Sequence, residues 1–207
     1  MAAYGRPSLR DLFDDSPTPH IAHPPETHHR DFYLATDGSF RADDGGLGVV
    51  IETRDGECVA RLSVPDVVPN NNVAEYRALH LGLDVLATRA PARSRIGVLV
   101  DHAELAANVN ATMLNLDAPG RTSPHQTSVP VDSVNHWRGI QARVRGFHAL
   151  RVARIESDVN PAHPLANAPS EYAHVNDEYE QCLRPEPPTR GGKPIPPPSR
   201  ADRAADD

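Results

Sequence analysis

Hydrophobic positions in the first half of the chain fall into three short runs. Residues 32–36, 47–53 and 58–64 are partly β-branched, and turns that contain Asp-Gly pairs separate them. Short runs of this kind between tight turns are typical of neighbouring antiparallel strands. The pattern therefore predicts a meander of three strands.

A helical pattern follows the meander. Over residues 72–90, apolar side chains recur every three or four positions until Pro91 ends the pattern. Residues 96–100 then form a continuous apolar run, which is expected of a strand buried on both faces. The members of the helical stripe are Val73, Tyr76, Leu79, Leu83 and Leu86.

The second half of the chain continues the alternation of strands and helices. We expect helices over residues 102–116, 132–147 and 170–183, a loop over residues 118–130, and a last strand over residues 150–155. Three antiparallel strands followed by alternating helices and strands indicate an α/β fold. Its core would be a mixed five-stranded sheet, antiparallel at first and then parallel, flanked by helices.

Proline marks both ends of the chain. Residues 1–30 form a Pro- and His-rich arm, in which residues 8–13 could make a capped helical turn or two, and residues 184–207 form a Pro-rich tail expected to be disordered. The folded domain is thus placed at residues 31–183. A metal site is not expected in the arm, because it offers no framework to fix coordination geometry; its histidines are His20, His23, His28 and His29.

Length and charge narrow the possible functions. The 207 residues suffice for one domain with tails, and a net charge of −7 excludes bulk attraction as the main source of nucleic-acid binding. Any polyanionic partner would need a local basic patch or metal ions. No apolar run approaches the roughly 20 residues that cross a bilayer. We expect a cytoplasmic, monomeric protein without a membrane partner, whose cysteines, Cys58 and Cys182, form neither a disulfide framework nor a zinc site.

Three acidic residues stand at element ends. Asp37 ends the first predicted strand, Asp101 ends the fourth, and Glu75 lies in the first turn of the first long helix. Each has an ordinary local interpretation: a turn residue for Asp37, a helix N-cap for Asp101, and a capping box with Asn72 for Glu75.

Glu75 is the most informative of the three, because helical spacing places its charge on the apolar stripe that faces the sheet, where a charge needs a partner. If parallel strands end at Asp37 and Asp101 beneath that helix, three carboxylates meet at one edge. Their repulsion would raise their pKa values unless a cation neutralised them. Oxygen ligands select Mg²⁺ or Mn²⁺, and such a cluster serves two-metal hydrolysis of a phosphodiester.

The order and spacing of five motifs resemble the ribonuclease H family, specifically the type 1, ribonuclease HI-like enzymes. The resemblance covers residues 31–168. Its motifs are TDGS at residues 36–39, NNVAE at 71–75, VD at 100–101, NHWR at 135–138 and NPAHPLA at 160–166.

This resemblance implies endonucleolytic cleavage of the RNA strand of an RNA/DNA hybrid, leaving a 5′-phosphate and a 3′-hydroxyl. By position, Asp37, Glu75 and Asp101 would be ligands of Mn²⁺ or Mg²⁺, with two ions when substrate is bound. Among nucleic-acid contacts, Asn71 and Asn72 would lie near the minor groove, where 2′-hydroxyls distinguish RNA from DNA, and Gly38 and Ser39 near the scissile backbone.

The sequence departs from the family at the fourth carboxylate. His163 stands at that position, and histidine is a poorer ligand for Mg²⁺ than for Mn²⁺ or softer ions. We therefore hypothesise an active enzyme that prefers Mn²⁺ and uses His163 as the fourth catalytic ligand. Asp158, a few residues upstream, is an alternative that fits the spacing less well.

The helix over residues 132–147 carries the basic candidates. In the family this helix holds the strand that is not cleaved, which would place Trp137, Arg138 and Arg143 against phosphates and sugars. The competing interpretation is a core tryptophan with solvated arginines. His102, after Asp101, could orient a phosphate or simply begin a helix.

Three functions remain open. The first is a metal-dependent ribonuclease acting on RNA/DNA hybrids. The second is a catalytically weakened nucleic-acid-binding module on the same fold, which the missing fourth carboxylate makes plausible. The third is a related exonuclease or resolvase, against which the Asn71-Asn72 pair argues.

Overall fold

A computed structural model describes residues 6–21, 30–41, 45–117 and 126–178. The expected tail at residues 184–207 and most of the loop at residues 118–130 lie outside these ranges. Of the four histidines in the arm, only His20 is described. None of the helices within the described ranges is long and apolar enough to cross a membrane.

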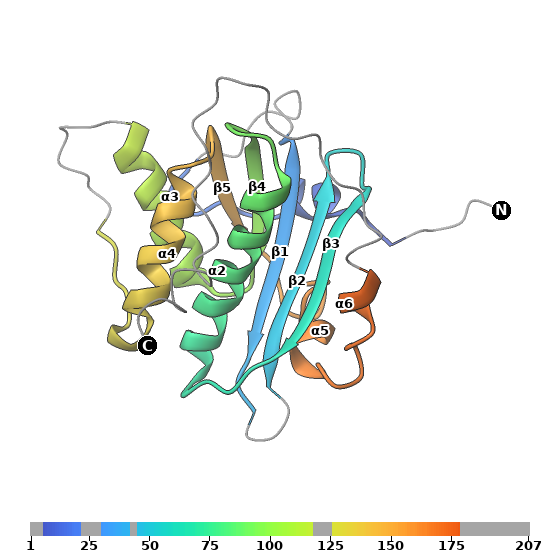
Figure 1. The fold of residues 1–207 in the computed structure, drawn as a ribbon. Coiled ribbons are helices and arrows are strands. Elements are labelled where there is room, and N and C mark those ends of the chain that lie inside the picture. The colour runs from blue at the N-terminus through green and yellow to red at the C-terminus, as the bar shows by residue number, and fades with distance from the viewer. Residues whose placement is uncertain (1–5, 22–29, 42–44, 118–125, 179–207) are drawn as a thin grey trace.

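The five strands form one mixed sheet with the order β3-β2-β1-β4-β5 (Figure 1). β1 pairs antiparallel with β2, and β2 with β3, whereas β1, β4 and β5 run parallel. The mixed sheet predicted from the sequence is confirmed. The strands are β1 (Phe32–Ser39), β2 (Gly46–Thr53), β3 (Cys58–Pro65), β4 (Arg95–Val100) and β5 (Ala149–Arg154).

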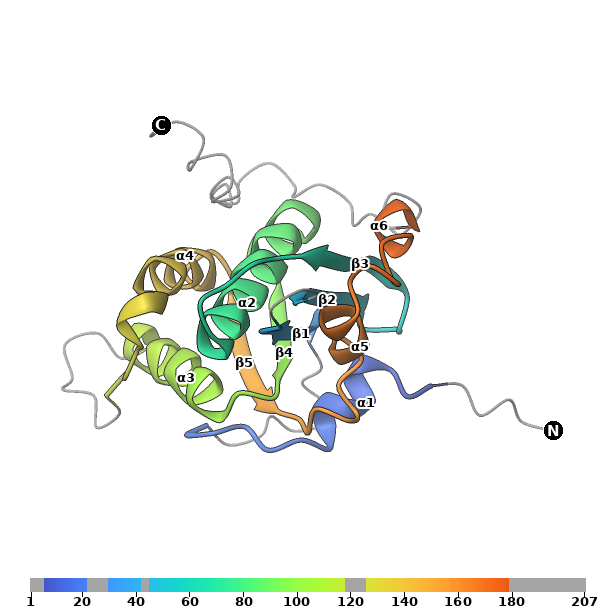
Figure 2. The same cartoon turned by 90° about the horizontal axis from the view of Figure 1, so that it is seen from below.

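Helices cover both faces of the sheet (Figure 2). On one face lie α2 (Asn71–Arg89), α3 (Ala103–Asp117) and α4 (Val134–Val144), the last preceded by a single 3₁₀ turn over Val131–Ser133. On the other face lie the short helices α1 (Leu9–Asp14), α5 (His163–Asn167) and α6 (Val175–Glu178). Within the described residues, the helix expected over residues 170–183 is confined to α6.

The strand alternation of side chains divides the core in two. Leu34 of β1 packs in the larger cluster beneath α2, α3 and α4, and its neighbour Tyr33 packs in the smaller cluster on the opposite face. Both side chains are fully buried, with at most 1% exposed. The central strands are therefore shielded from water on both faces, as their continuous apolar runs predict.

The described part of the N-terminal arm packs on the sheet. Ser8 and Asp11 form a capping box, which confirms the expected capped turn, and Leu9 and Phe13 are 1% and 0% exposed. Phe13 meets Tyr33 edge to face, and the backbone N–H of Leu9 donates to Glu52 at 2.8 Å. Outside α1 the described part of the arm has no helix or strand, as expected, while the two apolar side chains of α1 complete the smaller core.

The start of α2 differs by two residues from the expected capping box. Asn70 is the N-cap, and its side-chain oxygen accepts from the backbone N–H of Val73 at 3.0 Å. The proposed box of Asn72 with Glu75 is therefore wrong, and Glu75 is released from a capping role. Its position on the inner face of the helix needs another explanation.

Candidate metal and nucleic-acid site

Asp37 lies inside β1 and not in a turn after it. The strand continues to Ser39, and Asp37 pairs in register with Gly48 of β2. Only 2% of Asp37 is exposed. The turn interpretation of Asp37 is excluded, since its carboxylate belongs to the most buried strand of the sheet.

Glu75 reaches Asp37 because Gly38 lets the helix come close. A Cβ at Gly38 would overlap backbone atoms of Ala74 and Glu75, so only glycine permits the start of α2 to rest on β1. Glu75 is 2% exposed, and its Oε2 has no hydrogen-bond partner among the described residues. An unpaired buried carboxylate oxygen is costly unless a cation or a proton satisfies it.

Asp101 follows β4 directly. Because β1 and β4 run parallel, Asp37 and Asp101 meet at the same edge of the sheet. Asp101 is not a helix N-cap: α3 begins at Ala103, and the Nδ1 of His102 accepts from the backbone N–H of Leu105 at 3.1 Å. His102 therefore caps the start of the helix, while Asp101 accepts a hydrogen bond from the Ser157 hydroxyl at 2.7 Å.

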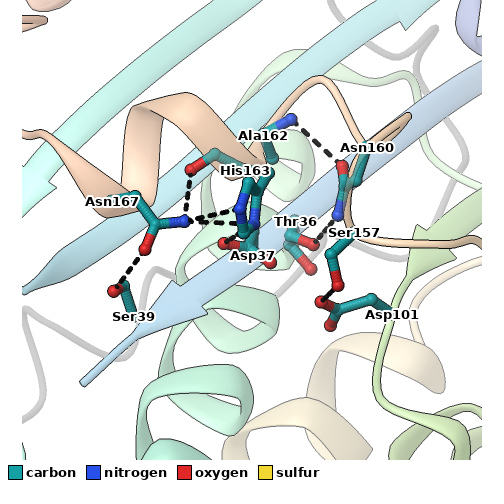
Figure 3. Close-up of polar contacts among 9 residues, drawn as sticks. All are labelled: Thr36, Asp37, Ser39, Asp101, Ser157, Asn160, Ala162, His163 and Asn167. Atoms are coloured by element: carbon teal, nitrogen blue, oxygen red, sulfur yellow. Dashed lines mark hydrogen bonds and ion pairs between the residues drawn. The ribbon is translucent and has the colours of Figure 1, made fainter.

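His163 completes the group at the first turn of α5 (Figure 3). Its Nδ1 lies 3.3 Å from Oδ2 of Asp37. Asp37, Asp101 and His163 each offer a ligand atom, and these atoms lie within 4.8 Å of one another. The structure thus brings the histidine to the carboxylates, and a divalent cation fits this group of donors.

The loop between β5 and α5 is held against β1 by Asn160, which is 2% exposed. Its amide nitrogen donates to the carbonyl of Thr36 at 3.0 Å, and its amide oxygen accepts from the N–H of Ala162 at 3.0 Å. Gly48 lets this loop come close to β2, because a Cβ there would overlap the Ala162 carbonyl oxygen. These contacts determine where His163 sits.

Asn167 supports the imidazole from one helical turn further along. Its amide nitrogen lies 3.0 Å from both ring nitrogens and from the carbonyl oxygen of His163, and its amide oxygen accepts from the Ser39 hydroxyl at 2.8 Å. Sequence reasoning missed both Asn167 and Ser157. The i, i+4 spacing of His163 and Asn167 was the available signal for the first. Nothing local pointed to Ser157.

The pKa values of Asp37 and Glu75 are raised. Burial, followed by the charge and hydrogen bonding of Asp101, raises the pKa of Asp37 to about 8. Burial also raises the pKa of Glu75 well above its ordinary value, with Asp101 and Asp37 adding to the shift. The site therefore favours either protons or a cation, as expected for negative charges gathered in a poorly solvated place.

Asp158 does not join the cluster. Its side chain is exposed, and it is not among the residues of the described chain grouped around a possible metal. The alternative that Asp158 replaces the missing carboxylate is therefore wrong for this conformation.

The residues expected at the minor groove and at the scissile backbone differ in exposure. Asn71 and Asn72 are exposed at the start of α2, whereas Gly38 and Ser39 are buried. Ser39 is 6% exposed and donates to Asn167, so its hydroxyl stabilises the site from inside. The two asparagines remain accessible to a ligand.

The three residues of α4 that were expected to contact nucleic acid also differ in exposure. Arg138 is exposed on α4, but Trp137 is 7% exposed and packs edge to face with Tyr76 in the core. Arg143 is 3% exposed, and its Nε donates to Asp84 of α2 at 2.6 Å. Phosphate contact by Arg143 and Trp137 does not fit this geometry, because α4 turns both side chains towards α2.

The strand order, the parallel pairing of β1 with β4 and the acidic edge define an α/β fold of the ribonuclease H type. The chain aligns with an RNase H1 called LC11, solved with an RNA/DNA hybrid, at 21% identity and a TM-score of 0.50, over 69% of this chain and 99% of that one. It also aligns with the PFV RNase H domain at 17% identity and a TM-score of 0.50, over 73% and 100%. These two alignments show that the fold is that of ribonuclease H.

A further alignment is to the N-terminal RNase H domain of a Mycobacterium tuberculosis protein, at 23% identity and a TM-score of 0.48, over 67% of this chain and 93% of that one. No protein-family model matches the sequence, and no curated protein matches it.

Proposed function

We propose that this protein is a metal-dependent endonuclease that hydrolyses the RNA strand of RNA/DNA hybrids. The observation that carries the proposal is the meeting of Asp37, Glu75, Asp101 and His163 at the carboxyl edge of two parallel strands in a ribonuclease H fold. The hybrid bound to LC11-RNase H1 supports the same substrate class. The domain would extend over residues 31–183, with α1 of the arm packed against it through Leu9 and Phe13.

Each ligand would have a distinct place. Asp37 and His163 would share one ion, because Oδ2 and Nδ1 already converge, while Asp101 lies within reach of both. Glu75 would contribute the Oε2 that has no partner among the described residues. Bound Mn²⁺ or Mg²⁺ supplies an activated water and stabilises the leaving oxygen.

The chain's own residues would set the geometry of the reaction. The water oxygen forms a new bond to phosphorus, the bond to the 3′-oxygen breaks, and the products carry a 5′-phosphate and a 3′-hydroxyl. Ser157 and Asn160 keep Asp101 and His163 in place during this exchange. Asn71 and Asn72 would contact the minor groove, and Arg138 the phosphates of the other strand.

The decisive experiment is cleavage of an end-labelled RNA/DNA hybrid with Mn²⁺ and separately with Mg²⁺. Duplex DNA and duplex RNA are the substrate controls, and Asp37→Asn is the matched inactive variant. We expect cutting of the hybrid alone, abolished by Asp37→Asn. Cutting that survives Asp37→Asn, or that is equal on duplex DNA, would reject the proposal.

A second candidate is a binding module that has lost turnover. The observation in its favour is His163, a nitrogen donor at the position where the family has a fourth carboxylate. This candidate predicts tight hybrid binding without cutting under either metal. Measuring binding of the hybrid beside its cleavage therefore separates the two functions.

A further inference from the structure

His102 and Asn72 form a contact that links the two elements bearing Asp101 and Glu75. The Nε2 of His102 lies 3.0 Å from Oδ1 of Asn72. His102 directly follows Asp101, and Asn72 lies three residues before Glu75, so the contact joins the start of α3 to the first turn of α2. It spans the two elements at the edge where nucleic acid would bind.

The protonation pattern of the His102 ring follows from its other hydrogen bond. Nδ1 accepts from the backbone N–H of Leu105 at 3.1 Å. A backbone N–H can only donate, so Nδ1 carries no proton, and the neutral ring must carry its proton on Nε2. Nε2 is therefore a donor towards Asn72.

This donor decides which way the Asn72 amide points. An amide group has one accepting oxygen and one donating nitrogen, and only the oxygen can accept from an N–H. The oxygen of Asn72 is thus held by His102, and its NH₂ has no hydrogen-bond partner among the described residues, which leaves it available to a ligand.

The ring itself is held by the core. Tyr76 lies one turn after Asn72 on α2, is fully buried and meets the His102 ring edge to face with centroids 6.2 Å apart. The Tyr76 hydroxyl in turn accepts from the amide of Asn108 of α3 at 3.0 Å. The orientation of His102 is therefore defined by packing as well as by the helix cap.

We propose that His102 is a positioning residue that locks the Asn72 amide with its NH₂ group outward, so that Asn72 donates to the acceptor atoms of the minor groove. The inference rests on the proposed function for the identity of the ligand. A preformed donor avoids the cost of ordering the amide on binding, so the lock contributes to affinity for the hybrid more than to the chemical step.

The chain offers a selective variant. In His102→Asn, the shorter side chain retains an oxygen that can accept from the Leu105 N–H, as asparagine does at helix N-caps, but it has no Nε2 to reach Asn72. His102→Ala loses both contacts. Comparing the two separates the lock from the stability of the helix start.

The test is steady-state cleavage of the hybrid by wild type, His102→Asn, His102→Ala, Asn72→Ala and the double variant that combines His102→Asn with Asn72→Ala. We expect His102→Asn to raise KM by about 3- to 10-fold, the range for one hydrogen bond, with a smaller change in kcat. The double variant should resemble Asn72→Ala alone, because the lock acts through Asn72. Multiplying effects of the two substitutions, or an unchanged KM in His102→Asn, would overturn the lock.

A second measurement does not depend on activity. The ¹⁵N chemical shifts of the His102 ring in mildly alkaline buffer report which nitrogen bears the proton. We expect the Nε2–H form in wild type, and the Nδ1–H form would overturn the inference. If wild type fails to cut the hybrid, the proposed function fails, yet the spectrum still decides whether the lock exists.

Discussion

The Nδ1 of His163 lies 3.3 Å from Oδ2 of Asp37, although β1 and α5, which carry them, are far apart in the sequence. This pair places a nitrogen donor beside a carboxylate whose pKa is raised to about 8 by burial and by Asp101. A mixed nitrogen and oxygen donor set favours Mn²⁺ over Mg²⁺. The metal preference of the site should therefore depend on residue 163.

Replacing the histidine by the family's carboxylate should change that preference. We expect wild type to cut the hybrid faster with Mn²⁺, and His163→Asp to raise the ratio of the Mg²⁺ rate to the Mn²⁺ rate by about tenfold or more. Initial rates at matched metal concentrations measure the ratio. His163→Ala is the control, since it removes the ligand without supplying an oxygen. A clear Mg²⁺ preference in wild type would refute the ligand argument.

The buried carboxylates should make the metal-free protein less stable as pH rises. Asp37 has a pKa of about 8 in the folded state against an ordinary value of 3.8, so the folded state binds a proton that the unfolded state releases. The stability that this proton contributes is complete below about pH 3.8 and is lost as pH rises to about 8. Glu75 shifts in the same direction.

The measurement is the free energy of unfolding in urea with a chelator, at several pH values across this window. Residue 37 stays neutral at every pH in Asp37→Asn. The free energy of unfolding of this variant should therefore fall less steeply with pH than that of wild type, with a slope smaller by up to about 1.4 kcal/mol per pH unit. Saturating Mn²⁺ should remove much of the decline in wild type. Parallel pH profiles for wild type and Asp37→Asn would contradict the assignment.

Two arginines of α4 should respond in opposite ways to substitution. Arg143 is buried in an ion pair with Asp84, so Arg143→Met should lower the free energy of unfolding by about 3–5 kcal/mol. Arg138 is exposed, so Arg138→Glu should change stability by no more than about 0.5 kcal/mol and should weaken hybrid binding with a shallower salt dependence. Denaturation and hybrid binding at several salt concentrations test both. Equal losses of stability in the two variants would contradict the structure.

The loop that carries His163 should depend on Asn160. Asn160→Ala removes two buried hydrogen bonds, to Thr36 and Ala162, and should cost about 1–3 kcal/mol of stability. It should also weaken Mn²⁺ binding by about 10-fold or more, because His163 loses its support. Asn115→Ala, an exposed position on α3, is the control for both readouts. Calorimetric Mn²⁺ titration that gives equal affinities for Asn160→Ala and wild type would show that the loop holds its shape without Asn160.

The sequence alone determined the architecture and the three carboxylates. Alternation along strands and the stripe over α2 are local patterns, and they determine which side chains face the sheet. Parallel strands bring their carboxyl ends to one edge, so Asp37 and Asp101 could be expected together, with Glu75 above them on the buried stripe.

Only the tertiary structure decided which of the candidate residues lie at the site and which are held by other elements. The burial of Arg143 depends on Asp84 of another helix, and the support of His163 depends on Asn167 and on Ser39 of β1. The docking of α1 likewise depends on β1, whose Tyr33 meets Phe13 edge to face. Such contacts join residues far apart in the chain, and a local pattern gives the face of an element but not the partner that this face will meet.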